Sequence, residues 1–538
     1  MTLQYSLLDE PLIRARLVGS GQPVQYSLPG LFVALARDEV RDFSALRPHQ
    51  RHPWHAFLVQ LAAMALHHAG RDKPFETEQE WKDALLVLTP EHTDGAAWCL
   101  IAPHDKPAFM QAPVPDGKIS DWKNTLYAPD ELDMLVTSKN HDLKAARMRR
   151  GELDDWVMAL ISLQTQEGYS GAGNYGISRM AGGCGCRVAM GAVPKGNVGQ
   201  RWGRDLAVLL NSRPSVVDDY GFETKNSNGL LWLLPWDGSG SLAFSSLDPF
   251  YIEICRRIRL VSDDAHVLYA KATTSKEIRV ASNNGKGGTG DSWTPINAID
   301  GEALKIRANG FSYDLAAALL FGNEYRKNSY RQPATMTLID SDGDDGIFAV
   351  MQALSRGGPT GNKSVTEGYH ERRIPISRKV RNMLRQKQTK KQLATVAEER
   401  VHAIGQLRRR VLWTALATLF NRGAKNDFSD STKDKAGVFA KTFEQAEDAI
   451  FFEELNAEID SEDPDSIRLQ WLRSMVDRAE AVLENAFIAG PQSSEQRYRA
   501  RSVALDKFRV LVNQEFPSLA DHYRSQLTLN KEIANESA

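Results

Sequence analysis

The last third of the chain carries apolar residues at steps of three and four positions, the spacing of one buried helix face. Four such runs occur, at 401–419, 439–455, 467–487 and 498–512. Pro464 suits the first turn of the third run and Gly490 ends it, while Ser493 and Gln496 have capping-box spacing before the fourth. Because short connections favour antiparallel helices, residues 376–538 are predicted to form an all-α four-helix bundle.

Upstream of this region the pattern changes. Short runs rich in β-branched and aromatic residues alternate with helical stretches, and glycine-rich loops interrupt both. The predicted strands are Leu230–Leu234, Leu242–Ser245, Glu277–Ala281 and Met336–Ile339, and the predicted helices are His55–His68, Ala145–Gln164 and Leu315–Phe321. We therefore predict a large, irregular mixed α/β domain of the α+β class over residues 1–375, followed by the bundle.

The composition of the 538 residues is that of a globular protein, with 42% hydrophobic and 25% charged residues. Four cysteines (Cys99, Cys184, Cys186 and Cys255) are too scattered for a disulfide framework, which favours a reducing compartment. The first residues lack the basic start and apolar run of a signal peptide, and no apolar stretch approaches the ~20 residues of a membrane span. We expect a soluble, cytoplasmic protein without a membrane partner.

The charge is unevenly distributed, although the net charge is only −2. Residues 372–410 hold thirteen Lys or Arg and two acids, a net +11, whereas residues 444–465 hold ten acids and no Lys or Arg. A basic run is typical of phosphate binding, because each neutralised phosphate releases counterions. Two alternatives remain open, namely a solvated helix face and mutual neutralisation of the two segments in the fold.

Residues Gly171–Gly176 match G-x-G-x-x-G, the dinucleotide-binding fingerprint. A dinucleotide fold needs a helix at the third glycine and an acid about twenty residues later. Here Gly182, Gly183 and Gly185 follow closely, and no acid occurs between Glu167 and Asp205. The segment is therefore predicted to be a glycine-rich loop whose backbone can approach a groove or a polyanion closely.

Other motifs do not assemble a catalytic or metal site. Asp340–Asp344 resembles the start of a calcium loop but lacks its glycine and glutamate, and Cys184-Gly185-Cys186 lacks a second ligand pair. His141-Asp142 is the one pair that suggests a metal-dependent phosphohydrolase acting on nucleotides or nucleic acid, and this alternative stays open. The chain is otherwise predicted not to be an enzyme and to need no cofactor.

Two polar loops, at 283–291 and 357–364, are predicted to be hairpin tips. A plain surface turn is the default interpretation of both. Amide and lysine side chains on glycine-flanked tips are also the groups that contact base edges and phosphates.

Seven segments together resemble the CasA family, the large subunit of Cascade, the type I-E CRISPR surveillance complex. They are Leu7–Pro11, Pro107–Gln111, Thr137–Lys144, Gly168–Gly183, Gly229–Trp232, Thr289–Pro295 and Thr366–Arg373. Their order and spacing span most of the predicted α/β domain, and the helical C-terminal third agrees with the four-helix bundle of the family. No single segment is decisive, whereas the combination is specific.

The resemblance implies a non-catalytic recognition subunit in antiviral defence. Such a subunit reads the protospacer-adjacent motif (PAM) on double-stranded DNA, largely from the minor groove, and promotes strand separation and R-loop formation. The implied partners are the CRISPR RNA, the double-stranded target DNA, the backbone, handle-binding and small subunits of Cascade, and a helicase–nuclease effector that the subunit helps to recruit. The basic segment 372–410 would hold DNA backbone.

The same resemblance implies the site residues. The DNA-contacting set would be Ser170, Gly171, Ala172, Gly173 and Asn174, with Lys276 and Lys286 as candidate phosphate contacts. Gly361, Asn362 and Lys363 would form the wedge hairpin tip, where the family often has glutamine. Lys139, Asn140 and His141 would dock on the guide RNA 5′ handle and a neighbouring subunit. Some members bind zinc through cysteine pairs that this chain lacks, so no metal is predicted. A purely structural adaptor, which would have no salt-dependent affinity for DNA, is a third hypothesis.

Overall fold

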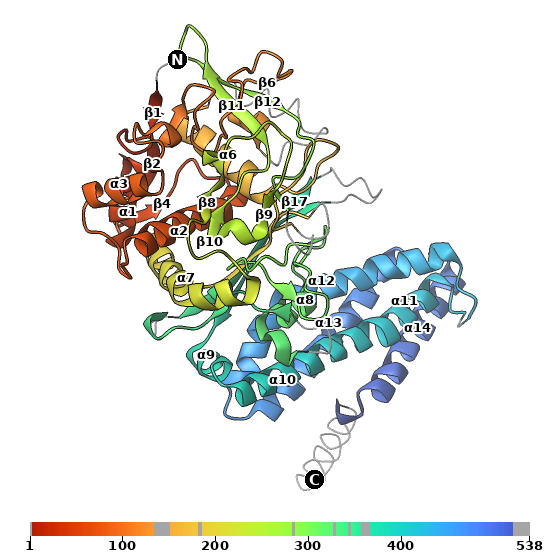
Figure 1. The fold of residues 1–538 in the computed structure, drawn as a ribbon. Helices are drawn as coiled ribbons and strands as arrows, with labels where there is room; N and C mark the ends of the chain where they lie inside the picture. The colour runs from red at the N-terminus through yellow and green to blue at the C-terminus, as the bar shows by residue number, and fades with distance from the viewer. Residues whose placement is uncertain are drawn as a thin grey trace. The chain divides into compact units, whose positions relative to one another are not determined.

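The structure is a computed structural model of the chain. It describes residues 3–133, 151–180, 185–281, 286–325, 330–342, 346–356, 366–424 and 426–519. The fold divides into two compact units, one formed by Met1–Phe311 with Asn328–Ile376 and the other by Ser312–Lys327 with Ser377–Ala538 (Figure 1). The sequence placed Ser312–Lys327 in the first domain, whereas it packs with the second: the ring of Tyr313 lies 5.1 Å from that of Phe451.

The first unit contains helices and short strands in an irregular order. Its helices are α1 (Leu28–Ala36), α2 (Arg51–His68), α3 (Glu78–Val87), α4 (Pro129–Leu132), α6 (Leu153–Gln166) and α7 (Val198–Tyr220). Its strands are β1 (Gln4–Ser6), β2 (Ile13–Leu17), β3 (Pro23–Tyr26), β4 (Val40–Asp42), β5 (Cys99–Ile101), β6 (Asn124–Leu126), β7 (Ala189–Pro194), β8 (Asn228–Leu230), β9 (Leu242–Ala243), β10 (Leu247–Ile252), β11 (Arg257–Ser262), β12 (Leu268–Thr273), β13 (Val280–Ala281), β14 (Ile296–Asn297), β15 (Tyr330–Arg331), β16 (Ile347–Arg356) and β17 (Thr366–Ile376).

Helix α2 is the centre of the core of this unit. Fifteen of its eighteen residues are buried, so it is apolar on nearly every side rather than along one stripe. Helices α3, α6 and α7 and strand β10 pack around it. The indole of Trp202 on α7 donates to the carbonyl of Leu58 on α2 at 3.4 Å, which joins the two longest helices of the unit.

The strands form several small sheets rather than one large one. Two of the three-stranded sheets matter for the site, the β17–β16–β7 sheet and the β11–β12–β6 sheet, and both are antiparallel. In the first, Met351 lies opposite Arg372 on one side and Met190 on the other. The predicted hairpin around 357–364 is confirmed by the pairing of β16 with β17, while its connection lies outside the described residues.

Several local predictions are wrong. Residues 336–339 contain no strand, because a 3₁₀ turn occupies Ala334–Met336. Strand β8 ends at Leu230 and continues as a 3₁₀ turn, so Leu230–Leu234 is not a strand either. The loop 283–291 is not a hairpin tip, because β13 pairs in parallel with β9 rather than with the strand that follows the loop.

The second unit is helical. It contains α8 (Tyr313–Phe321), α9 (Arg378–Leu384), α10 (Lys387–Gln406), a π-helical segment (Leu407–Leu412), α11 (Trp413–Phe420), α12 (Asp430–Asp460), α13 (Pro464–Asn485) and α14 (Ser494–Glu515). Helix α10, the π-helical segment and α11 form one continuous helix, which packs with α12, α13 and α14. The predicted α+β region followed by a C-terminal helical bundle is therefore confirmed.

The basic and acidic runs partly neutralise each other within this unit. Arg400 Nε donates to Glu458 Oε2 at 2.7 Å and both side chains are buried, while Arg408 pairs with Glu444 at 3.1 Å. The guanidinium of Arg400 also lies 4.2 Å from the ring of Trp471. Mutual neutralisation, one of the alternatives open at the level of sequence, thus accounts for part of the charge pattern.

Candidate nucleic-acid interface

The glycine-rich segment after α6 folds into a tight turn. The amide of Ser170 donates to the carbonyl of Asn174 at 3.0 Å, and the amide of Asn174 donates to the carbonyl of Gly171 at 2.9 Å. Gly171 and Gly173 have φ of +124° and +78°, which side-chain-bearing residues rarely adopt. Ala172, between them, is exposed. The tip of the turn therefore exposes backbone atoms and the methyl group of Ala172 to solvent. We call residues 168–176 the glycine loop.

The glycine loop rests against the end of β12. The amide of Ser275 donates to the carbonyl of Gly173 at 2.9 Å. A Cβ atom on Gly173 would lie 2.6 Å from Cβ of Thr274, so the two backbones meet at a distance that only glycine allows. A Cβ atom on Gly171, in contrast, would meet nothing within 4 Å. The open side of the turn is thus at Gly171 and Ala172.

Lys276 lies directly beyond this contact. Its amide donates to the carbonyl of Gly238 at 2.7 Å, which fixes the backbone next to the glycine loop. The residue is exposed and forms no ion pair within the part of the chain that the structure describes. The structure therefore places the backbone of Lys276, an exposed residue, next to the glycine loop.

Lys286 is placed differently. Gly287, its neighbour, packs on the segment that follows the glycine loop, since a Cβ atom there would lie 2.8 Å from the carbonyl oxygens of Arg179 and Met180. The ammonium group of Lys286 is exposed but forms an ion pair with Glu302. This hydrogen bond raises the pKa of Lys286. A phosphate would therefore compete with Glu302 for this lysine.

Two arginines hold the base of the glycine loop. Arg256 Nη2 donates to the carbonyl of Gly168 at 3.1 Å and to Ser170 Oγ at 3.0 Å. Arg356, the last residue of β16, forms an ion pair with Glu167. All these groups except Ser170 are buried. Sequence reasoning missed both arginines, because nothing in their spacing distinguishes them from surface arginines.

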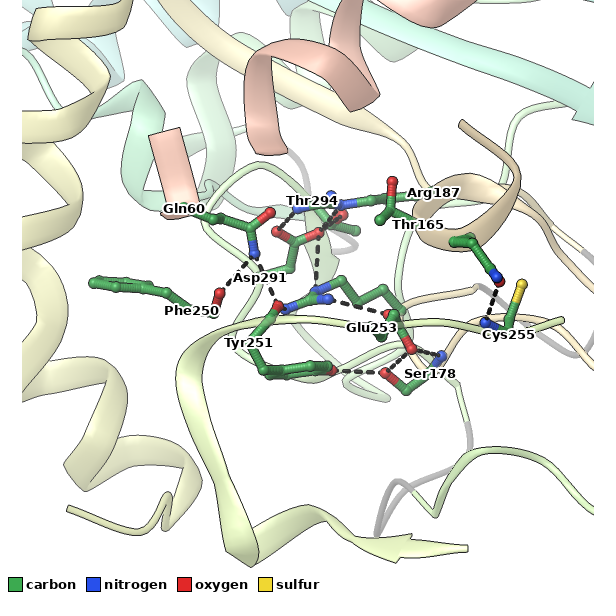
Figure 2. Close-up of polar contacts among 12 residues, drawn as sticks. Gln60, Thr165, Ser178, Arg187, Phe250, Tyr251, Glu253, Cys255, Asp291 and Thr294 are labelled. Atoms are coloured by element: carbon green, nitrogen blue, oxygen red, sulfur yellow. Dashed lines mark hydrogen bonds and ion pairs between the residues drawn. The ribbon is translucent and has the colours of Figure 1, made fainter. Parts of the chain in front are cut away.

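A buried polar cluster holds the residues that follow the glycine loop, and Figure 2 shows Ser178, Tyr251 and Glu253 within it. Ser178 donates from its amide to Glu253 Oε2 at 2.8 Å, and its hydroxyl lies 2.6 Å from the hydroxyl of Tyr251. Arg179 donates to Glu253 Oε1 at 3.1 Å and to the carbonyl of Tyr251 at 2.9 Å. These contacts fasten the end of the glycine-rich segment to the residues at the end of β10.

Asp291 connects this cluster to the next segment. It accepts hydrogen bonds from Arg187 Nε and Nη2, both at 2.6 Å, and from the hydroxyl of Thr294 at 2.7 Å, as Figure 2 shows. Burial alone would raise the pKa of Asp291, but Arg187 and Arg179 outweigh it, so the pKa lies well below its usual value. The carboxylate is therefore charged, and it ties Arg187 to the loop that carries Lys286.

The remaining predicted site residues lie outside the described residues. They are Lys139, Asn140 and His141 of the handle-docking segment, Asp142 of the phosphohydrolase alternative, and Gly361, Asn362 and Lys363 of the wedge tip. Within the described part of the chain, Cys99 and Cys255 are buried free thiols, and no group of three or more His, Cys, Asp or Glu side chains could hold a metal ion. A search of the described helices finds none with both the length and the low polarity needed to cross a bilayer.

The chain thus combines an α+β unit with a helical bundle, and its glycine loop lies next to Lys276, which has no ion-pair partner among the described residues. No family model and no curated protein sequence matches the chain. Solved structures do match over nearly its whole length. The Thermus thermophilus CasA (Cse1) structure has 13% sequence identity and a TM-score of 0.63, and covers 95% of this chain and 100% of its own.

Two further structures agree. Thermobifida fusca Cse1 has 14% identity and a TM-score of 0.64, with 96% of this chain and 98% of that one covered. A chain of a CRISPR RNA-guided surveillance complex has 13% identity and a TM-score of 0.57, with 95% and 100% covered. The fold is that of CasA (Cse1), so the resemblance that the sequence showed to this family is confirmed for the fold.

Proposed function

We propose that this chain is the non-catalytic large subunit of a type I-E CRISPR RNA-guided surveillance complex. The CasA fold over nearly the whole chain supports this role, and one similar structure is a CRISPR RNA-guided surveillance complex. The observation that carries the proposal is the exposed turn at Ala172, fixed by two positive-φ glycines beside the unpaired Lys276. We infer that this turn approaches the PAM and that Lys276 contacts a neighbouring phosphate.

The chemistry of the turn suits a minor groove. The minor groove is about 6 Å wide and presents a degenerate pattern that separates A·T from G·C pairs, so a reader needs backbone atoms close to the base edges. Large side chains would prevent this approach, whereas the open space around Gly171 permits it. The anchoring by Arg256 and by Ser275 holds the turn in one conformation before DNA arrives.

The proposal extends to strand separation. The β16–β17 pairing supports a hairpin whose connection includes Gly361, Asn362 and Lys363, and we assign the wedge to this connection. Opening the duplex beside the PAM costs roughly 1–2 kcal/mol per base step, and pairing with the guide RNA returns about as much. A wedge therefore needs to contribute only a small free energy to favour strand separation. Lys139, Asn140 and His141 would dock on the guide RNA handle and a neighbouring subunit in the cytoplasm, and the assembled complex would recruit the helicase–nuclease effector.

The deciding experiment is a gel-shift titration of the assembled complex with duplexes that differ only in the PAM. We expect affinity to depend on the PAM and to fall steeply with salt concentration. A purely structural adaptor would leave both dependences unchanged when the glycine loop is altered. Metal-dependent turnover by the isolated chain, abolished in His141→Ala, would favour the phosphohydrolase instead.

Lys276→Gln is expected to weaken DNA binding about tenfold, because a charge-assisted contact contributes about 1.5 kcal/mol. The loss should be similar for every PAM, and the slope of log K against log salt should fall by about one. Lys118→Gln, a change at another exposed lysine of the same unit, is the matched control. Equal salt slopes for the two variants would contradict a phosphate contact at Lys276.

A further inference from the structure

A cavity of about 550 Å³ opens in the first unit, away from the glycine loop. It is bounded by the start of α2, the β7–α7 connection and the paired strands β16 and β17, and no residue of 168–176 lines it. Six cationic side chains occur in its wall: Arg16, Arg41, Arg51, Lys195, Arg201 and Arg373. Asp42 and Glu371 are the carboxylates in the same wall. The lining therefore has a net excess of positive charge.

The two carboxylates are already engaged. Asp42 accepts from Arg16 Nε at 2.6 Å and from Arg41 Nε at 3.1 Å. Glu371 accepts from the hydroxyl of Tyr369 at 2.6 Å and from Gln352 Nε2 at 3.0 Å, and lies 4.0 Å from Arg373. Among the described residues, neither Arg51 nor Lys195 forms an ion pair within 4.0 Å.

Three buried polar atoms in the wall lack a hydrogen-bond partner within the described structure, namely Trp54 Nε1, Arg201 Nε and Gln352 Oε1. Arg201 Nε lies 4.0 Å from Asp205. The carboxylate oxygens of Asp205 are already hydrogen-bonded to His55 at 2.8 Å and to Arg204 at 3.1 Å. Gln352 is only 4% exposed. A buried polar atom without a partner costs about 1–3 kcal/mol, so a ligand that supplies partners is favoured.

The environment of Arg201 also favours an anion. Burial lowers the pKa of Arg201, the carboxylate of Asp205 offsets part of this shift, and the positive charge of Arg373 lowers the pKa further. An anion bound beside Arg201 and Arg373 would compensate both positive charges. The guanidinium fork matches the oxygens of phosphate or carboxylate groups, and Gln352 Oε1 needs a donor from the same ligand.

We propose that this cavity binds a nucleotide, with its phosphate at Arg201 and Arg373 and an N–H or O–H of its sugar or base at Gln352 Oε1. The volume lies in the range of about 300–1,000 Å³ that small-molecule sites occupy. A phosphate with up to two charges suits an excess of four cations better than a single carboxylate does. Phe348, with Arg373 5.0 Å from its ring, adds an aromatic face. The ligand is either a free nucleotide or one nucleotide of a strand, and this site goes beyond the proposed reading of the PAM.

The proposal explains a sequence segment that the glycine loop leaves without a role. Glu371 and Arg373 belong to the segment Thr366–Arg373, one of those that carry the resemblance to CasA. On β17 both residues line the cavity, and Glu371 holds Gln352 through its amide nitrogen. The amide oxygen of Gln352 is thereby left as the acceptor for a ligand.

The test is calorimetric titration of the full chain with inorganic phosphate, AMP and a short single-stranded RNA. We expect AMP or the RNA to bind, and Arg201→Gln to weaken that binding at least tenfold. Arg373→Gln, at a half-exposed side chain, should have the same effect and serves if Arg201→Gln does not fold. Gln352→Met should weaken AMP binding but leave binding of inorganic phosphate unchanged. Lys118→Gln should change none of these affinities.

Each outcome is decisive. Binding of AMP supports a free nucleotide, and binding of the RNA alone supports a nucleotide within a strand, provided that Arg201→Gln or Arg373→Gln weakens it. Equal affinity of wild type and both arginine variants would overturn the site. Binding of phosphate and AMP with the same affinity, insensitive to Gln352→Met, would overturn the recognition of a nucleotide. Binding of none of the three probes at millimolar concentration would also overturn the proposal.

Discussion

Asp291→Asn is expected to lower the free energy of unfolding of the first unit by about 3–5 kcal/mol, the range for removing one partner of a buried ion pair. Arg187 and Arg179 are each at most 2% exposed at the side chain, and Asp291 is the carboxylate that Arg187 contacts. Without it the charge of Arg187 would be buried without compensation. The amide would keep the shape of the side chain, so the loss would report charge rather than packing.

The same carboxylate makes stability depend on pH. Its pKa in the folded chain lies below the value of about 3.9 that it has when unfolded. The stabilisation is therefore fully present above about pH 4 and is lost as the pH falls toward the folded pKa. Asp291→Asn should remove this part of the acid sensitivity, so the stabilities of variant and wild type should converge below pH 4.

Urea unfolding followed by tryptophan fluorescence measures both effects, since Trp293 lies 5.4 Å from the guanidinium of Arg187. Asp264→Asn, at an exposed aspartate of the same unit, is the matched control and should change stability by less than about 0.5 kcal/mol. A loss below about 1 kcal/mol in Asp291→Asn would show that Arg187 finds another partner. Asp291→Asn should also weaken DNA binding, because the cluster anchors Ser178 and Arg179, directly after the glycine loop.

Ala172→Glu is expected to reduce DNA binding by the assembled complex about 10- to 100-fold. A carboxylate at the exposed tip of the turn would face the phosphates on either side of a minor groove, and like charges in an interface cost several kcal/mol. The fold should be unaffected, because Ala172 is exposed and has no positive φ. Gel-shift titration with a preferred PAM measures the effect.

Ala172→Gln distinguishes the effect of the negative charge of Glu from the effect of its size, because Gln is similar in size but uncharged. If the backbone of the turn reads the base edges, Gln should weaken binding and reduce discrimination between PAMs, though less than Glu does. Full PAM discrimination in both variants would contradict contact at the turn. Gly173 is a poor test position, because a substitution there is strained at φ +78° and would collide with Thr274, so lost binding could reflect lost structure.

The long helices could be predicted from the sequence because their buried faces repeat at helical spacing. The helices of the bundle follow this rule. Helix α7 does not, since Pro214 and two glycines lie within it and each disfavours a helix in isolation. Tertiary packing on α2 overrides these local preferences. The very short strands could not be placed, because two or three residues carry no period.

The candidate site divides in the same way. The glycine spacing marked the loop, since residues with side chains rarely adopt the conformations of Gly171 and Gly173. The arginines that hold the loop, Arg256 and Arg356, could not be found, because burial decides their role and a sequence does not record burial. The pairing of Lys286 with Glu302 joins residues sixteen positions apart, so it too depends on the fold.

The anchoring of the glycine loop has a kinetic consequence. The turn is closed by its own amides and held by Arg256, so the loop should lose little conformational entropy when a duplex binds. Encounter should then be fast and nearly the same for every duplex, and an unsuitable base pair would be rejected by rapid departure. Selectivity of this chain should accordingly appear in residence times rather than in association rates.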